Sequence, residues 1–196
     1  MVLSCTLIAA FCPSTAHSAD QSFALGVNQL VTNGIPGVGA GNIENPGDTD
    51  TYTFTGAAGQ RLYFDERSGL GCDPKLRWRL TDPDGVQLFD ELFAATEQCG
   101  SGPDAGIITL AKSGSFRIQV RGIAGAVTSY SFQVFLATPQ QFALSFGQTV
   151  TNGVPALGAG NIETPGAVDI YTFSATAGQK AYFDEMTGFG CNFGLR

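Results

Sequence analysis

Basic residues are scarce in this chain, and so are charges of either sign. Only 14% of the 196 residues are charged, and 10 Lys and Arg against 17 Asp and Glu give a formal net charge of −7. Nucleic-acid binding relies on Lys and Arg that neutralise phosphates. The charge balance therefore predicts that neither DNA nor RNA is a partner.

The chain also lacks the usual catalytic groups. Its single histidine, His17, lies in an N-terminal segment that we expect to be removed, and neither a Gly-x-Ser-x-Gly nor a Cys-x-x-Cys motif is present. A Ser-His-Asp triad is therefore excluded. Asp65 and Glu66 are adjacent in a predicted strand, so their side chains point to opposite faces and cannot act together on one glycosidic bond. We predict no catalytic residue and a protein that is not an enzyme.

No apolar run is long enough to span a bilayer. The stretch from Val2 to Phe11 is mostly apolar, and the small residues around Ser18 and Ala19 suit a cleavage point. We predict that residues 1–19 form a signal peptide and that the protein is secreted or held at the cell surface. No Lys or Arg precedes the run, so a buried first strand remains the alternative.

A stretch of 55 residues occurs twice. Phe142 to Arg196 repeats Phe23 to Arg77 without a gap, and 33 of the 55 positions are identical. The first copy is followed by 64 further residues from Trp78 before the second begins, whereas the second ends before the position of Trp78. The repeat predicts a complete domain at 20–138, a linker at 139–141 and a truncated second copy at 142–196, so that neighbouring repeats are partners.

Apolar and polar residues alternate through most of the first copy and beyond it, as in half-buried strands. We expect one strand over Gln21 to Val31 and another around Tyr52 and Phe54. Trp78 alternates with Arg77 and Arg79, which places it toward the core. About eight short strands separated by turns such as Asp82-Pro83-Asp84-Gly85 predict an all-β protein, an antiparallel β-sandwich or barrel.

Three cysteines remain after the predicted signal peptide. Cys72 and Cys99 belong to the same repeat, and in an exported protein they predict a disulfide. Cys191 is the counterpart of Cys72. The alternative is a metal site or a reactive thiol, for which the expected close cysteine spacing is missing.

Several side chains are candidates for binding. Glu44, Asp50 and Asp65 all return in the second copy, and they could contribute to the six to eight oxygens that Ca²⁺ requires. The alternative is structural, with Asp50 accepting from turn amides and Asp65 paired across a strand with Arg61. Tyr63 and its counterpart Tyr182 lie on the face opposite Leu62 and Phe64, so they are ligand-binding candidates, with cross-strand packing as the alternative.

The order of motifs in the first copy resembles one family. Gly41-Asn42-Ile43-Glu44, Pro46-Gly47, Asp50-Thr51-Tyr52-Thr53-Phe54 and Gly59-Gln60 are similar to the bacterial pre-peptidase C-terminal domain, and Ser129-Tyr130-Ser131-Phe132 is similar to its end. The resemblance implies a jelly-roll-like β-sandwich appended to secreted enzymes, often proteases, or repeated in surface proteins. It implies a non-catalytic role, and in some members binding of calcium or extracellular polymers.

These observations predict a non-catalytic accessory, spacer or binding module of a larger bacterial exported or surface protein. Its partners would be an extracellular polysaccharide or protein, and it would require no cofactor except, in one alternative, calcium as a structural ion. The other alternative is the accessory end of a secreted peptidase or other hydrolase.

Overall fold

The structure is a computed structural model that describes residues 20–68, 75–93 and 105–186. The predicted signal peptide and Cys72, Cys99 and Cys191 lie outside these residues, so the disulfide stays a prediction. The chain separates into two compact units, the first up to Gln140 together with Ile162–Val168, and the second comprising Gln141–Asn161 and the residues from Asp169 onward. Each unit is described by itself.

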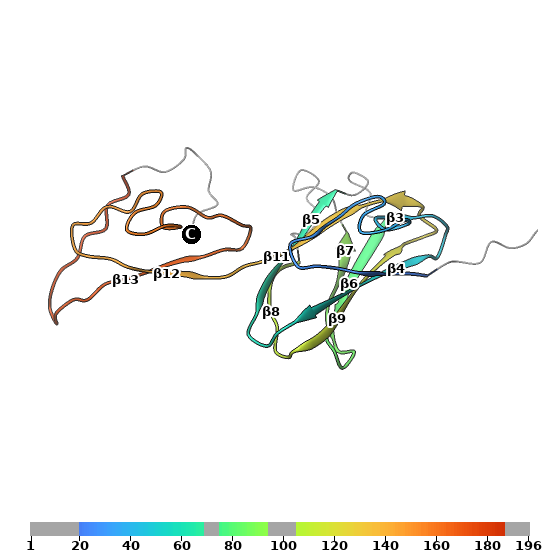
Figure 1. Cartoon of the computed structure of the whole chain (residues 1–196), viewed down its shortest axis with the longest axis horizontal. Helices are drawn as coiled ribbons and strands as arrows, with labels where there is room; N and C mark the ends of the chain where they lie inside the picture. Colours follow the sequence, from blue (N-terminus) through green and yellow to red (C-terminus); the bar gives the residue numbers. More distant parts are fainter. Residues whose placement is uncertain (1–19, 69–74, 94–104, 187–196) are drawn as a thin grey trace, which may run out of the picture. The chain divides into compact units, whose positions relative to one another are not determined.

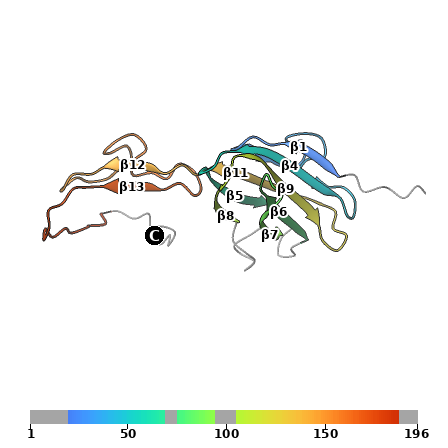
Figure 2. The ribbon, with the colours of Figure 1, turned by 90° about the horizontal axis from the view of Figure 1, so that it is seen from below.

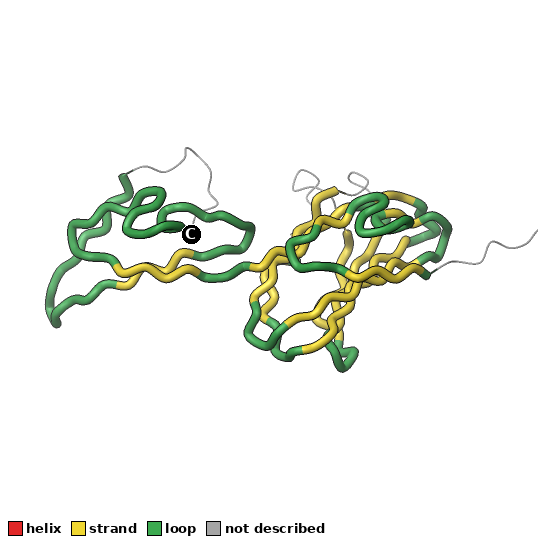
Figure 3. The backbone as a smooth tube through the Cα atoms, viewed as in Figure 1, coloured by secondary structure: helices red, strands yellow, loops and turns green. Residues whose placement is uncertain are grey.

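The described residues contain strands and loops and no helix (Figure 3). No helix in these ranges therefore meets the length and apolarity that a membrane crossing requires. The prediction of an all-β protein is confirmed. The strands are β1 (Gln21–Ala24), β2 (Leu30–Val31), β3 (Asn42–Ile43), β4 (Thr49–Gly56), β5 (Arg61–Ser68), β6 (Leu76–Thr81), β7 (Gln87–Phe93), β8 (Gly106–Thr109), β9 (Gly114–Gly122), β10 (Thr128–Ser129), β11 (Ser131–Leu136), β12 (Gln140–Ala143) and β13 (Asp169–Thr172).

The first unit is a β-sandwich of two sheets (Figure 1, Figure 2). One sheet has five strands in the order β1-β4-β9-β6-β7, and the other has four in the order β2-β11-β5-β8. A small pair, β10-β3, closes one end. The strands of the two large sheets pair in antiparallel fashion, with the exception of β1, which runs parallel to β4.

The single strand expected over Gln21 to Val31 is wrong, since the chain changes sheets there. β1 ends at Ala24 in the five-stranded sheet, and β2 begins at Leu30 in the other. Between them Asn28 has a φ of 70°, a left-handed conformation that Asn tolerates better than most residues. The amide of Leu136 donates to its Oδ1 at 2.9 Å. This turn breaks the strand, and the crossover that it begins explains why β1 and β4 are parallel.

The core lies between the two sheets and is largely aromatic. Trp78, only 1% exposed, has its ring centroid 5.2 Å from those of Phe89 and Phe93 in its own sheet and 5.8 Å from that of Phe132 in the opposite sheet. The predicted inward position of Trp78 is confirmed. Each fully buried side chain of this size contributes about 1.5–3 kcal/mol of hydrophobic stabilisation.

The glycine-rich loop before β4 places its backbone close to the turn after β2. Gly41 has a φ of 70°, and a Cβ at that position would lie 2.3 Å from the carbonyl carbon of Thr32 and 2.6 Å from the amide nitrogen of Asn33. Backbone atoms cannot give way as a flexible side chain would. Glycine at position 41 is therefore required by space as well as by backbone conformation.

We expect Gly41→Ala to lower the free energy of unfolding by several kcal/mol, measured by urea denaturation. Gly59→Ala is the matched control, because Gly59 has a similar φ of 81° but nothing within 4 Å of the added Cβ. It should show only the backbone cost of about 1 kcal/mol. Equal losses in the two variants would contradict the steric explanation.

Candidate functional site

The polar centre of the first unit is a buried cluster of Asp50, Tyr52 and Tyr130. The alternation of β4 turns Asp50 and Tyr52 toward the core, and Tyr130 lies between β10 and β11. The hydroxyl of Tyr130 donates to Asp50 Oδ2, and the hydroxyls of Tyr52 and Tyr130 are 2.8 Å apart. The amide of Gly41 donates to the Tyr52 hydroxyl at 2.8 Å. The cluster thus fixes the glycine-rich loop against the end of the core.

Burial raises the pKa of Asp50 to about 6. Hydrogen bonds from Tyr130, Tyr52 and the backbone of Asn42 lower this pKa, and the nearby charge of Glu44 raises it, but desolvation is the largest effect. Asp50 Oδ1 has no hydrogen-bond partner in the part of the chain that the structure describes. Burial likewise raises the pKa of both tyrosines, so they remain neutral donors at physiological pH.

The second unit has the same motif in an open form. Gly160 donates to the Tyr171 hydroxyl at 2.7 Å, and that hydroxyl donates to Asp169 Oδ2 at 2.9 Å. Tyr171 is partly exposed, whereas Tyr52 is fully buried. Both copies thus keep the link between loop and strand, and in the first copy Tyr130 adds a second hydroxyl. We interpret the role of the cluster as structural, because Asp50 is completely buried and a substrate in solution could not contact it.

Of the three calcium candidates, Asp50 and Glu44 are near each other, whereas Asp65 belongs to the other sheet. Asp50 faces the core of the five-stranded sheet, and Glu44 is near it, with Glu44 Oε2 accepting from Gln21 Nε2 at 3.0 Å. Asp65 lies on the outer face of the other sheet, where Arg67 Nε is 3.4 Å from its Oδ2. Across the described ranges, no group of three or more His, Cys, Asp or Glu could hold a metal ion. Calcium binding stays a prediction that these residues do not strengthen.

The two tyrosine candidates have different surroundings. Tyr63 is half-buried on the outer face of β5, in register with Phe135 of β11 on one side and Ile107 of β8 on the other. This cross-strand row agrees with the packing alternative. Tyr182 is 89% exposed in the second unit. The structure therefore does not give equivalent positions in the repeat an equivalent environment.

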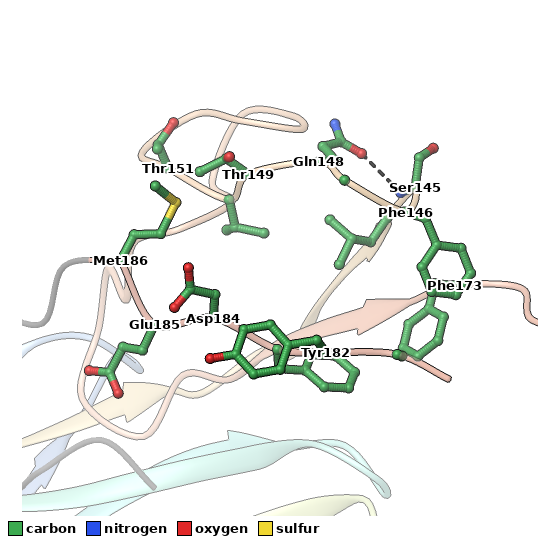
Figure 4. Close-up of a pocket in the computed structure, with 15 residues that line it drawn as sticks. Ser145, Phe146, Gln148, Thr149, Thr151, Phe173, Tyr182, Asp184, Glu185 and Met186 are labelled. Atoms are coloured by element: carbon green, nitrogen blue, oxygen red, sulfur yellow. Dashed lines mark hydrogen bonds between the residues drawn. The ribbon is translucent and has the colours of Figure 1, made fainter. Parts of the chain in front are cut away.

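Tyr182 lies beside a hollow of about 660 Å³ in the second unit (Figure 4). The apolar residues around it correspond to core positions of the first unit. Phe173 is 41% exposed and Phe183 is 72% exposed, whereas their counterparts Phe54 and Phe64 are 2% and 0% exposed. Within the described residues, the second unit has only β12 and β13 as strands. We therefore interpret the hollow as an uncovered core face. Its lining comprises Leu144, Ser145, Phe146, Gly147, Gln148, Thr149, Val150, Thr151, Phe173, Ala181, Tyr182, Phe183, Asp184, Glu185 and Met186.

The outer face of the five-stranded sheet gathers arginines from two adjacent strands. Arg77 of β6 is in register with Arg121 of β9, and Arg79 with Gln119. Asp90 of β7 joins the pair, with its Oδ1 2.9 Å from Arg77 Nε and its Oδ2 3.2 Å from Arg121 Nη2. The arginine charges lower the pKa of Asp90 against the effect of its burial. The sequence contains the signal, since arginines alternate with core residues in both strands, but it does not reveal that β6 and β9 are neighbours.

No family model and no curated protein matches this chain. Solved structures similar to it include PliG of Aeromonas hydrophila, a periplasmic lysozyme inhibitor of g-type lysozyme, with 16% identity over 60% of this chain and 99% of that one and a TM-score of 0.40.

Two further structures have similar statistics. The pre-peptidase C-terminal domain of collagenase from Bacillus anthracis has 16% identity over 60% of this chain and 98% of its own, with a TM-score of 0.37. PliG of Salmonella Typhimurium, also a periplasmic inhibitor of g-type lysozyme, has 19% identity over 58% and 98% of the two chains, with a TM-score of 0.37.

Proposed function

We propose that the chain is a non-catalytic β-sandwich module that serves a larger exported bacterial protein as an accessory or binding domain. One observation carries this proposal. In the first unit the acid with the strongly raised pKa, Asp50, is sealed inside the core with two tyrosines, while the outward charged side chains lie on open sheet faces. Catalysis needs its reactive groups in contact with substrate, and a sheet face that presents outward charged side chains is suited to binding.

Asp82, another acid of the first unit, also has structural partners. Asp82 accepts from the amides of Asp84 and Val86 at 2.9 and 2.8 Å, which closes the turn after β6, and Lys112 Nζ lies 2.6 Å from its Oδ2. The hydrogen bond from Lys112 lowers the pKa of Asp82, so this acid is held ionised. Export is supported by the apolar N-terminal segment and the cysteine pair of the sequence.

The test uses the full chain in two parallel assays. We expect no release of dye from azocasein and no hydrolysis of p-nitrophenyl glycosides, together with retention of the chain on at least one insoluble bacterial or plant cell-wall polymer. The proposal would be wrong if either substrate were turned over, and loss of that turnover in Asp50→Asn would assign the activity to the buried cluster. Retention on no polymer, with no turnover, would favour a spacer over a binding domain.

A further inference from the structure

We propose that the outer face of the five-stranded sheet binds a linear polysaccharide that carries carboxylate groups. This inference rests on the proposed binding function and names its ligand class. We call this surface the arginine face, defined by Arg77, Arg79, Arg117, Arg121 and the side chains in register with them. It holds four of the 10 Lys and Arg of the chain.

The register of the strands builds a regular array of cations. Outward residues alternate along β6 and β9, so Arg77 lies beside Arg121, while Arg117 lies beside Thr81. Neighbouring strands are about 4.8 Å apart, and outward residues on one strand are about 6.8 Å apart. The guanidinium groups therefore recur along the strands and across them on one face of the sheet. A polymer with regularly repeated anions can meet several of them at once.

The charge of the arginine face is opposite to that of the whole chain. The strand register and the ion pairs place one acid, Asp90, on this face, so four arginines and one aspartate give +3, against −7 for the complete sequence. Glu91 is in register with the core residue Trp78 and belongs to the other side of the sheet. Such a local positive surface on an acidic protein favours an anionic ligand by charge complementarity.

Asp90 holds Arg77 and Arg121 in place by hydrogen bonds and leaves several of their N–H donors unused. Arg77 donates from Nε to Asp90 Oδ1 and from Nη2 to the Asp90 backbone oxygen at 2.7 Å, and a guanidinium has five N–H donors. Three donors of Arg77 therefore remain for a ligand. Arg79 donates from Nη2 to Gln119 Oε1, and Arg117 is exposed without an ion-pair partner in the described residues. A planar guanidinium fits a carboxylate with two parallel hydrogen bonds.

Hydroxyl groups border the arginines on one side. β4 pairs with β9 so that Thr49 lies beside Arg121, Thr51 beside Gln119 and Thr53 beside Arg117. A hydroxyl is both donor and acceptor, which suits the hydroxyls of a sugar next to its carboxylate. The combination of guanidinium and hydroxyl rows favours an acidic glycan over a simple anion.

The same face is poorly suited to nucleic acid. Single-strand binding uses aromatic side chains on which bases stack, and the aromatic residues of β4, β6 and β9 all point into the core. Duplex DNA is read by an element that enters a groove, whereas β9 and β6 lie inside the sheet between neighbours. Nucleic acid is therefore an outcome to be tested against the proposal.

The experiment measures binding of the full chain to sodium alginate, a soluble polyuronate, by isothermal titration calorimetry at low salt, with neutral dextran in parallel. We expect binding to alginate, none to dextran, and weakening as salt is raised. Arg117→Gln combined with Arg121→Gln should weaken alginate binding at least tenfold. The matched control is Arg61→Gln combined with Arg67→Gln on the other sheet, which removes the same charge and should change the affinity less than twofold. Near-UV circular dichroism checks that all variants are folded.

Three results would overturn the inference. Equal weakening in the two double variants would show a response to overall charge, and tighter binding to poly(dT) than to alginate would assign the face to nucleic acid. Absence of alginate binding at low salt would reject the ligand class. If the chain is still retained on another polymer, and neither double variant reduces that retention, the proposed binding function stands while this inference fails.

Discussion

Phe54→Ala is expected to lower the free energy of unfolding of the first unit by about 3–5 kcal/mol. Phe54 is 2% exposed, and its ring centroid is 5.4 Å from that of Phe116 and 6.3 Å from that of Phe64, which belongs to the opposite sheet. Removing the ring leaves a cavity between two sheets that are each held by their own hydrogen bonds. The surrounding side chains can fill it only in part. Urea denaturation followed by the fluorescence of Trp78, the single tryptophan and a core residue of that unit, measures the loss.

The repeat supplies the matched control. Phe173 occupies the same position in the second copy and still contacts Phe146 and Phe183, with centroids 5.4 and 5.8 Å away. It is nevertheless 41% exposed, so Phe173→Ala removes little surface that was withdrawn from water. We expect a change below about 1 kcal/mol in a urea transition followed by far-UV circular dichroism, which reports on both units. A comparable loss for both variants would contradict our interpretation that the hollow in the second unit is an uncovered core face.

The stability of the first unit should fall as the pH rises through the titration of Asp50. The pKa of Asp50 is about 6 in the folded protein against 3.8 as its ordinary value, because burial disfavours the charged form. The folded state therefore binds the proton more tightly than the unfolded state. The stabilisation is fully present below pH 3.8 and is lost as the pH rises to and beyond about 6. A pKa difference of this size corresponds to about 3 kcal/mol.

Asp50→Asn isolates this contribution, because the amide can still accept a hydrogen bond from Tyr130 but cannot ionise. Other groups titrate too, and Asp82 and Asp90, whose pKa values are lowered, act in the opposite direction. The measured quantity is therefore the free energy of unfolding of the wild-type chain minus that of Asp50→Asn, by urea denaturation at several pH values. We expect this difference to shift against the wild type by about 2.4 kcal/mol between pH 4 and pH 7. A difference that does not depend on pH would show that Asp50 is not desolvated in solution.

Tyr130→Phe serves as the second variant for this prediction. This substitution removes the Tyr130 hydroxyl, which donates a hydrogen bond to Asp50. That hydrogen bond lowers the pKa of Asp50. The pH range in which stability is lost should then move upward. A structural change elsewhere in the core would destabilise the protein without moving this range.

Much of the first unit follows from local sequence. The alternation around Tyr52, Phe54 and Trp78 identifies the inward side chains correctly, because side chains in a strand point to alternate faces whatever the strand pairs with. The broken first strand was not predictable in this way. Whether the residues after Ala24 continue one strand or leave for the opposite sheet depends on Asn28 and on its contact with Leu136, which is 108 positions away.

The candidate sites, too, were only partly predictable from the sequence. Sequence reasoning selected Glu44, Asp50 and Asp65 together because all three recur in the repeat, and the structure places Asp50 inside the sandwich and Asp65 on the outside of the other sheet. It passed over the arginines of β6 and β9 as ordinary outward residues. They become a surface only because those two strands, separated by β7 and β8 in the chain, are neighbours in the sheet.

The sequence by itself determined the strand-rich class, the duplicated segment, the core face of each strand and the scarcity of catalytic groups, since each depends on composition or on the two-residue period of a strand. Tertiary structure alone decided the strand order, the enclosure of Asp50 by Tyr52 and Tyr130, and the contrast between the filled core around Phe54 and the open one around Phe173. Those features arise from contacts between distant parts of the chain. Two segments that are identical at 33 of 55 positions therefore bury corresponding residues to different extents.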